Sequence, residues 1–534
     1  MNRARFCLAL PVILGVMALP AVAQFQVQKV FASDTLPQAA FANRVAIAGN
    51  WAVVADAERF GGAGGVYIFE RTSSGWVERQ ILDNPDPNLQ DYFGSYMALE
   101  GNTLVVSCPR DDVACPSDPM CDSGSAYIYQ QSGGVWTLAT RLVPTDNGPG
   151  DFFGYPVCIS SGTLMVGAQH DDDTVVGSGS VYIYERTPSG WFLLQKLHAS
   201  DPGIGARFGQ TLVLNRNQAL ISAPHNSTIA SVAGAVYVFE RGASGWSQTD
   251  VLRVSGTFRF GDSGLGIDGD TILISGLSAG PVRIGWVRHF ERDLTGWSEQ
   301  VRIEPRAPRS PDDFGSPILL RGDRAIIGAE RDDAAGSSAG AFYVFDRGAS
   351  DEWSEVAKVL PPSLGAGDLF GISMAESQGV VLAGAWKDDE HALDAGAAYI
   401  IDIDGLRKYC PGPPNQSGMP AELSVRGTAG VQVNDLTLVA GPVAPTTGMV
   451  FYGTHAVQVP FGTLLRCVGG RLYRSAVTAS GQGTIVSRLD FTSPVRPSGT
   501  ILPGSTWYFQ AWYRDSLNGT EHGFSDALAI TFGP

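Results

Sequence analysis

Residues 208–246 read FGQTLVLNRNQALISAPHNSTIASVAGAVYVFERGASGW. Two short apolar runs, 210–214 and 219–223, flank a polar turn, and a third run at 235–241 alternates aromatic and aliphatic side chains. A turn that contains glycine then leads into Trp246. Short apolar runs bounded by Gly, Asn and Ser are typical of β-strands joined by tight turns. The stretch therefore predicts a meander of four antiparallel strands.

The same stretch recurs along the chain at intervals of 52 to 60 residues. Its opening dipeptide recurs at this spacing six times, and Phe41-Ala42 is a degenerate seventh copy. The six are Phe93-Gly94, Phe153-Gly154, Phe208-Gly209, Phe260-Gly261, Phe314-Gly315 and Phe370-Gly371. The tryptophan recurs with it, at Trp76, Trp136, Trp191, Trp246, Trp297 and Trp353. A period of this length is typical of solenoids, propellers and arrays.

The two ends of the repeat region complement each other. The seventh copy ends near residue 404 without its tryptophan strand, whereas residues 25–34 match the outer strand of the third copy, residues 192–201, at six of ten positions. We therefore expect residues 25–32 to pair with the strand at 397–403 and to close a ring. This closure predicts a seven-bladed β-propeller. A linear solenoid is the alternative, but the polar capping repeats that it requires are not recognisable.

The repeat resembles the FG-GAP repeat, the blade unit of the propeller in integrin α-subunits. The resemblance rests on the Phe-Gly openings and on strands such as Gly234-Ala235-Val236-Tyr237-Val238-Phe239, and it covers about residues 25–404. It implies a propeller and an extracellular binding or adhesion role. Integrin-type blades often carry a calcium loop of pattern Asp-x-Asp-x-Asp-Gly, which is missing here, with Asp268-Gly269-Asp270 as the nearest approach. We therefore expect no metal site and no cofactor.

The domain organisation predicted from the sequence has four parts. Residues 1–23 combine an arginine-containing start, an apolar run and an Ala-x-Ala exit, as secretory signal peptides do. Residues 24–404 form the propeller, and 405–420, rich in proline, form a linker. Residues 421–534 alternate over about seven short runs, which predicts a β-sandwich. This last part resembles C-terminal modules of secreted bacterial repeat proteins.

Charge and hydropathy limit the partners. The formal net charge of −16 becomes −18 when residues 1–23 are removed, because Arg3 and Arg5 go with them. Nucleic-acid binding depends on Lys and Arg neutralising phosphates, so nucleic acid is not expected as a partner. No segment after the signal peptide has the length of a membrane span. We expect an exported protein, either extracellular or at the cell surface.

Six cysteines remain after removal of Cys7, and an even number suits disulfides in an exported chain. Sequence alone allows 15 pairings. The local candidates are Cys115 with Cys121 within one loop, Cys108 with Cys158 in neighbouring repeats, and Cys410 with Cys467, which would tie the linker to the last domain.

The candidate binding surface is acidic. In a four-stranded blade, the loop between the second and third strands and the loop to the next blade share one face. These long loops carry Asp111, Asp112, Asp171, Asp172, Asp173, Asp332, Asp333, Asp388 and Asp389. A negative rim of this kind could bind a cation or a basic partner. Aspartates also simply make Asx turns in such loops, which is the more ordinary interpretation.

No catalytic motif accompanies the repeat. Of the seven histidines, only His170, His225 and His391 occupy comparable long-loop positions, and a shared site would require them to converge. We expect a non-catalytic binding or adhesion protein whose partner is a protein or carbohydrate at the cell surface. The alternatives are a structural component of the envelope and a propeller hydrolase or lyase whose site the sequence does not reveal.

Overall fold

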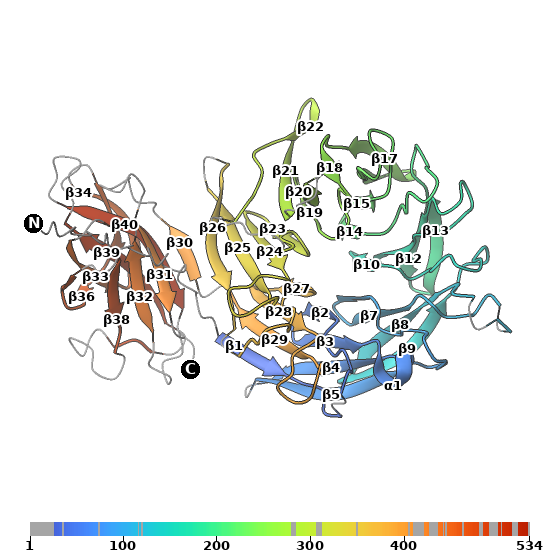
Figure 1. Cartoon of the computed structure of the whole chain (residues 1–534), viewed down its shortest axis with the longest axis horizontal. Helices are drawn as coiled ribbons and strands as arrows, with labels where there is room; N and C mark the ends of the chain where they lie inside the picture. The colour runs from blue at the N-terminus through green and yellow to red at the C-terminus, as the bar shows by residue number, and fades with distance from the viewer. Residues whose placement is uncertain are drawn as a thin grey trace, which may run out of the picture. The chain divides into compact units, whose positions relative to one another are not determined.

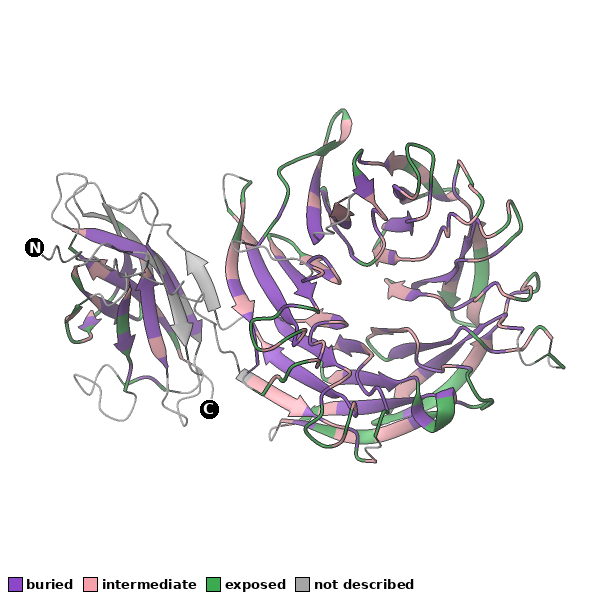
Figure 2. Cartoon of the chain, in the orientation of Figure 1, coloured by how far each residue is buried: buried purple, intermediate pink, exposed green. Residues whose placement is uncertain are grey.

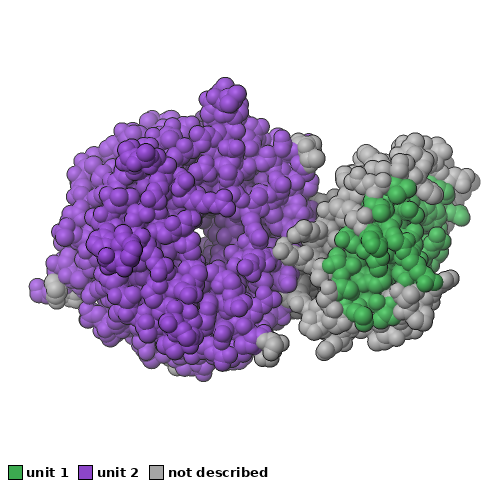
Figure 3. All heavy atoms as spheres, turned by 180° about the vertical axis from the view of Figure 1, so that it is seen from behind, with its two compact units in different colours: residues 1–23, 408–534 green, residues 24–407 purple. Residues whose placement is uncertain are grey.

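A computed structural model describes most of the chain. The described residues are 26–34, 37–72, 75–115, 117–118, 121–278, 285–305, 312–348, 351–361, 363–403, 406–409, 421–426, 436–441, 443, 446–461, 464–479, 484–490, 500–502, 505–514 and 522–531. Two compact units are present, one formed by residues 24–407 and one that includes residues 408–534 (Figure 3). The predicted signal peptide, residues 1–23, lies outside the described residues.

The larger unit consists of antiparallel sheets arranged around a centre (Figure 1). We call each sheet a blade, and its described residues contain seven. Blades 1 to 4 are β2 (Arg44–Ala48), β3 (Trp51–Asp56), β4 (Gly65–Thr72) and β5 (Gly75–Asp83); β6 (Met97–Glu100), β7 (Thr103–Cys108), β8 (Ser125–Ser132) and β9 (Val135–Leu142); β10 (Val157–Ser160), β11 (Thr163–Ala168), β12 (Ser180–Thr187) and β13 (Gly190–Leu197); and β14 (Leu212–Asn215), β15 (Gln218–Ala223), β16 (Ala235–Gly242) and β17 (Gly245–Leu252). One helical turn, α1 (Arg59–Gly62), interrupts the loop after β3.

The remaining blades follow the same plan. Blades 5 to 7 are β18 (Thr257–Phe258), β19 (Leu265–Asp268), β20 (Thr271–Ser278), β21 (Gly285–Asp293) and β22 (Gly296–Glu299); β23 (Ile318–Arg321), β24 (Arg324–Ala329), β25 (Ala341–Arg347) and β26 (Trp353–Val359); and β27 (Met374–Ser377), β28 (Val380–Ala385) and β29 (Ala397–Asp402), completed by β1 (Gln26–Val30). The all-β propeller is thus confirmed, with four-stranded blades except blade 5, whose sheet contains the additional two-residue strand β18.

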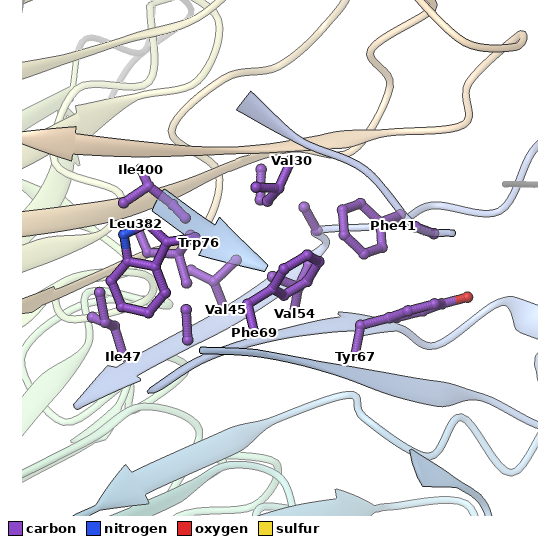
Figure 4. Close-up of a cluster of buried hydrophobic side chains, with 14 of the residues drawn as sticks. Val30, Phe41, Val45, Ile47, Val54, Tyr67, Phe69, Trp76, Leu382 and Ile400 are labelled. Atoms are coloured by element: carbon purple, nitrogen blue, oxygen red, sulfur yellow. The ribbon is translucent and has the colours of Figure 1, made fainter. Parts of the chain in front are cut away.

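The N-terminal strand closes the last blade, as predicted. β1 pairs antiparallel with β29, from Gln26 opposite Asp402 to Val30 opposite Ala398. Apolar side chains from blade 1 and blade 7 then form one buried cluster, in which Val30 and Ile400 face Phe41 and Trp76 (Figure 4). Closure therefore buries apolar surface that either terminus alone would leave in water.

Apolar layers between neighbouring blades form the core. The middle strands β7, β11 and β28 are buried along their whole length, whereas the outer strands carry exposed residues (Figure 2). Separate clusters fill the spaces between blades 1 and 2, 2 and 3, 3 and 4, and 4 and 5. Because each layer needs two blades, every repeat depends on its neighbours for burial.

Steric fit between neighbouring blades explains why the repeat keeps a glycine where its third strand begins. The glycine that precedes the third strand of each blade lies directly against the Phe-Gly phenylalanine of the next. A Cβ on these glycines would lie 2.0 to 2.5 Å from a backbone atom of that phenylalanine, which is too close for any side chain. The glycines are Gly64, Gly124, Gly179, Gly234, Gly285, Gly340 and Gly396, and all but Gly285 have a φ of +82° to +90°. Gly396 meets Phe41, so the degenerate seventh copy closes the ring.

The phenylalanine ring has a partner inside its own blade. Phe153, for example, packs edge-to-face on Tyr182 of β12, with ring centres 5.2 Å apart. Five further blades repeat this pair at 5.1 to 5.5 Å. The second residue of the dipeptide has a positive φ throughout, and in the degenerate copy Ala42 adopts a φ of +70°. Alanine in place of glycine in this copy therefore leaves the backbone conformation unchanged.

The outer strands share one irregularity. In blades 1, 2, 3, 4 and 6 the pairing of the third and fourth strands shifts by one residue, at equivalent positions of each blade. A β-bulge at a sheet edge increases the local twist and makes pairing with another chain harder.

The C-terminal unit is also built of antiparallel strands. They are β30 (Leu406–Tyr409), β31 (Glu422–Arg426), β32 (Thr437–Gly441), β33 (Thr447–Gly453), β34 (His455–Phe461), β35 (Leu464–Gly469), β36 (Tyr473–Arg474), β37 (Thr478–Ala479), β38 (Ile485–Arg488), β39 (Thr506–Tyr513) and β40 (Gly523–Thr531). They form sheets of six, three and two strands. The β-sandwich packing of these sheets stays a prediction. β30 lies within the predicted linker 405–420 and joins the edge of the largest sheet, beside β40; residues 410–420 lie outside the described residues.

The disulfide predictions have different outcomes. Cys115 and Cys121 are bonded, as predicted. The pairing of Cys108 with Cys158 is wrong, because both are free thiols. Cys108 faces the apolar layer between blades 1 and 2, whereas Cys158 packs on the layer between blades 3 and 4, so the two side chains belong to different layers. Cys467 is disulfide-bonded, and its predicted partner Cys410 lies outside the described residues.

Candidate functional site

The long loops of neighbouring blades are hydrogen-bonded to each other. The amide of Gly205, in the connection from blade 3 to blade 4, donates to the carbonyl of Val176 in the loop after β11, at 2.8 Å. Gly150 and Cys121 make the equivalent contact one blade earlier, at 2.6 Å. Both kinds of long loop therefore lie on one face of the propeller, as predicted. We call it the long-loop face.

The first aspartate of each acidic loop is buried. Asp171 accepts hydrogen bonds from the Tyr182 hydroxyl at 3.3 Å and from Ser180, and it pairs with Lys196 of the outer strand at 2.7 Å. Three other blades repeat this Asp-Tyr-cation triad. They contain Asp111, Tyr127 and Arg141; Asp332, Tyr343 and Lys358; and Asp388, Tyr399 and Lys29.

The electrostatics of the triads are those of internal ion pairs. Burial works against the charge of Lys29, but its hydrogen bonds to Asp388, Glu390 and Tyr399 outweigh this and raise its pKa. Burial also raises the pKa of Tyr182, so its hydroxyl stays protonated and donates to Asp171. A buried carboxylate needs such partners, because an unpaired charge in the interior is costly. The triads therefore join the long loops to the outer strands.

Two blades lack the aspartate and replace it from another loop. Blade 4 has Asn226 at this position, and the Tyr237 hydroxyl donates instead to Asp201 at 2.7 Å, which pairs with Arg253 at 2.5 Å. Blade 1 has Arg59, which pairs with Asp34 at 2.6 Å, and Asp34 also accepts from Tyr67 at 2.6 Å.

The two replacement aspartates end the same tripeptide. Asp34 and Asp201 each end an Ala-Ser-Asp sequence after an outer strand. A carboxylate, a tyrosine and a cation thus meet in these two blades as well, with the carboxylate supplied by the connection from the preceding blade. The repeated Ala-Ser-Asp tripeptide could have indicated these two aspartates from the sequence.

The second aspartate of each loop organises its own loop. Asp172 accepts the amide of Gly177 at 2.5 Å, and Asp333 accepts that of Ser338 at 2.8 Å. Asp389 and Asp112 accept amides in the same way, from Asp394 and Asp122. Asp172, Asp173, Asp333 and Asp389 are exposed and Asp112 is half-buried.

The nine predicted aspartates therefore do not form one continuous acidic surface. Four of them, Asp111, Asp171, Asp332 and Asp388, are buried. A role in binding stays a prediction for this set, and only the other five are placed where a partner could reach them.

A further set of buried aspartates precedes the Phe-Gly dipeptides. Asp91, Asp151 and Asp368 stand two residues before the phenylalanine, and each accepts a backbone amide at 2.6 to 2.9 Å. Burial raises the pKa of each carboxyl from an ordinary value of 3.8 to about 6, a shift that the amide opposes and neighbouring aspartates increase.

These three carboxyls are expected to make stability depend on pH between about 4 and 6. Because the pKa of each carboxyl is higher in the folded state than in the unfolded state, the folded state binds these protons more tightly. The protonated carboxyls therefore raise the free energy of unfolding at low pH, and this contribution is lost as the pH rises through 6. Each of Asp91→Asn, Asp151→Asn and Asp368→Asn should reduce the difference in melting temperature between pH 5 and pH 7. Asparagine keeps an acceptor for the amide.

Thermal unfolding at pH 5, 6 and 7 measures this effect. Exposed Asp270→Asn is the control and should leave the pH dependence unchanged. Equal pH dependence in all four variants and the wild type would contradict the assignment.

Large apolar side chains lie at the tips of the long loops, and sequence reasoning missed them. Phe60, Leu89, Val176, Ile204, Ile229 and Leu393 are between 47% and 81% exposed. Most of them stand in polar segments, as Ile204 does between Gly203 and Gly205. The contrast between an apolar residue and its polar neighbours could have indicated these tips from the sequence. Binding residues concentrate on loops that a rigid scaffold positions, so these tips are candidate contact points for a partner.

The histidines behave only in part as expected. His170 and His225 lie on adjacent blades, close enough for their charges to interact, so the long loops do bring two of the three together. His391 instead stacks on Phe31, with ring centres 3.7 Å apart. Among the described residues, no group of three or more His, Cys, Asp or Glu side chains could hold a metal ion.

Comparisons with known proteins match the repeat. Five segments match the FG-GAP repeat family: residues 76–129, 136–184, 191–239, 297–345 and 353–401. Each begins at the tryptophan of one outer strand and ends in the third strand of the next blade. No curated protein sequence matches the chain significantly.

Two solved structures illustrate the structural likeness. Hydrazine synthase of Kuenenia stuttgartiensis is similar with a TM-score of 0.46 and 11% identity, over 70% of this chain and 99% of that one. The β-propeller domain of the Trilobed protease from Pyrococcus furiosus has a TM-score of 0.39 and 8% identity, over 67% of this chain and 94% of that one. In the described part of this chain, no helix is long and apolar enough to cross a membrane.

Proposed function

Because the chain is an FG-GAP repeat β-propeller protein, we propose that it is an exported binding protein whose long-loop face holds a partner polypeptide at the cell surface without catalysing a reaction. The observation that carries the proposal is the set of exposed apolar loop tips, Phe60, Leu89, Val176, Ile204, Ile229 and Leu393, on that face. Single apolar residues on a rigid scaffold can fill pockets of a partner, as interface anchors do.

Charge defines the chemistry of the partner. Exposed Asp172 and Asp389 share their loops with the apolar tips Val176 and Leu393, exposed Asp333 lies in the equivalent loop of blade 6, and the whole chain is acidic. A partner with apolar pockets and a basic rim complements this arrangement. A polypeptide offers both features, whereas a neutral carbohydrate offers neither the charge nor deep apolar pockets.

A structural role in the envelope and catalysis are the competing functions. The buried triads support the first, because they stiffen the loops whether or not a partner is present. Catalysis would require reactive groups assembled at one place, and the buried carboxylates Asp111 and Asp388 of this face are engaged in internal ion pairs. Binding therefore accounts best for side chains that the fold itself does not use, which are the apolar tips.

Binding of the purified full-length mature protein to envelope fragments of the producing cell tests the proposal. The triple variant Leu89→Ser, Val176→Ser and Ile204→Ser should bind at least about tenfold more weakly, the loss expected from removing two or more anchors. The matched control is Val135→Ser, Leu138→Ser and Phe192→Ser, on outer strands with 45% to 53% exposure, which should bind as the wild type does.

Treatment of the fragments identifies the partner class. Protease treatment should abolish binding, whereas binding that survives protease but not periodate oxidation of sugars would mean a carbohydrate partner. Absence of binding by the wild type, or equal loss in both triple variants, would contradict the proposal.

A further inference from the structure

Two positions of each repeat meet at the inner end of the long-loop face. One is the residue before the triad aspartate, and the other lies directly before the Phe-Gly phenylalanine. The backbones are joined close to these positions: the amide of His225 donates to the carbonyl of Ala206 at 3.3 Å, and that of Lys387 to Asp368 at 3.4 Å. The Phe-Gly dipeptide leads into the innermost strand of its blade, so both positions surround the centre, where Figure 3 shows an opening.

In blades 2 and 3 the side chains at these positions form a row of contacts. The Arg110 guanidinium lies 5.1 Å from the centre of the Tyr92 ring and 6.0 Å from that of Phe152. The Phe152 ring in turn packs edge-on against His170 at 5.1 Å. We call this row, together with Arg207, His225 and Arg259, the channel mouth.

Arg207 and Arg259 occupy the position before the phenylalanine in blades 4 and 5, where their amides donate to the carbonyls of Gly177 at 3.2 Å and Val232 at 2.9 Å. Burial and then the charge of Arg207 lower the pKa of His170. Burial, Arg207 and Arg259 lower the pKa of His225, against the opposite effect of Asp262. Two histidines on adjacent blades thus lie near arginine charges, whose effect Asp172 opposes at His170 and Asp262 opposes at His225.

The positive charge of the channel mouth is only partly neutralised. Within the described residues, Arg110 and Arg207 make no ion pair, and Arg259 pairs with Asp262 alone, at 3.6 Å. Two polar atoms of the channel mouth also have no hydrogen-bond partner in the part of the chain that the structure describes. They are Nε2 of His225 and Nε of Arg259. Buried polar groups normally have partners, so these atoms indicate a place for a polar ligand or water.

We propose that the channel mouth is a binding site for a small anion, a molecule that carries a carboxylate or phosphate group. Arginine presents paired N–H donors that match the oxygens of either group. A concave site focuses the field of several cations on one point. The Tyr92 and Phe152 rings offer apolar surface to the remainder of such a molecule.

The inference deepens the proposed function and rests on it for the choice of face, with the anion bound at the centre and the polypeptide at the loop tips around it. Because two separate sets of residues are involved, the two proposals can fail independently.

Isothermal titration of the full-length mature protein with citrate, and separately with inorganic phosphate, tests the site at low ionic strength. The double variant Arg110→Gln and Arg207→Gln should lower the affinity at least tenfold. The control is Arg71→Gln and Arg216→Gln, which changes the net charge equally at exposed positions on the opposite ends of the strands and should change the affinity less than twofold. Neither arginine of the test pair takes part in an ion pair within the described residues, so the fold is expected to persist; circular dichroism checks this.

The two probes distinguish the sources of the anion. Binding of citrate alone assigns a carboxylate ligand, and binding of phosphate alone assigns a phosphorylated one; either supports the site. Absence of binding by both, or equal weakening in the test and control variants, would overturn it. The triple variant at Leu89, Val176 and Ile204 should lose envelope binding but keep its citrate affinity. A wild-type protein that binds citrate but not the envelope fragments would contradict the proposed function alone.

Discussion

Gly396→Ala is expected to lower the free energy of unfolding of the propeller by about 3 kcal/mol, because it acts where the ring closes. Gly396 has a φ of +82°, and a Cβ at this position would lie 2.0 Å from the carbonyl oxygen of Phe41. Alanine must therefore adopt a left-handed conformation and also push blade 1 away from blade 7. Urea denaturation followed by tryptophan fluorescence measures the loss.

Gly101→Ala is the matched control for this prediction. Gly101 also has a positive φ, +55°, but nothing lies within 4 Å of a Cβ there. This substitution should lower the free energy of unfolding by about 1 kcal/mol, the cost of holding alanine in a left-handed conformation. Similar losses of stability in the two variants would mean that the steric contact with Phe41 adds nothing to the cost. Close packing between blades would then not explain the recurring glycine.

Lys358→Met is expected to destabilise the protein by about 3–5 kcal/mol, since it leaves a buried carboxylate without its cation. Asp332 is buried and pairs with the Lys358 ammonium at 2.5 Å, while the Tyr343 hydroxyl donates to it at 2.9 Å. Methionine keeps much of the apolar stem of lysine. The loss therefore reports the uncompensated charge rather than a cavity.

A second substitution separates charge from packing. Asp332→Asn added to Lys358→Met removes the stranded charge and should restore most of the stability, as measured by the same urea titration. Lys387→Met, at a half-exposed lysine without an ion pair in the described residues, should change stability by less than about 1 kcal/mol. If the double variant is no more stable than Lys358→Met alone, the triad is not an electrostatic unit.

Much of the fold could be predicted because the same pattern of residues recurs in seven copies. A Gly or Phe that returns every 52 to 60 residues identifies a structural position even when its contact is unknown. The match between residues 25–34 and 192–201 likewise placed the N-terminal strand in the last blade, which the register of β1 with β29 confirms.

The site was harder to predict, because its residues are assembled across strands. Asp171, Tyr182 and Lys196 were all visible in the sequence, and each has counterparts at similar spacing in other copies. Nothing in that spacing reveals that the three side chains meet, so the aspartates looked like a solvent-exposed rim. The pairing of Cys108 with Cys158 failed for a related reason, since sequence proximity does not reveal which inter-blade layer a side chain faces.

The sequence by itself determined the period, the strands within each period and the closure of the last blade by the first strand, because these depend on local patterning and on complementary copies. Only the tertiary structure decided which charges are internal, which glycines meet a neighbouring blade and that Arg110, His170, Arg207, His225 and Arg259 form one channel mouth. The physical reason is that desolvation, ion pairing and steric fit depend on distances between blades, and residues some 50 positions apart acquire those distances only when the ring closes.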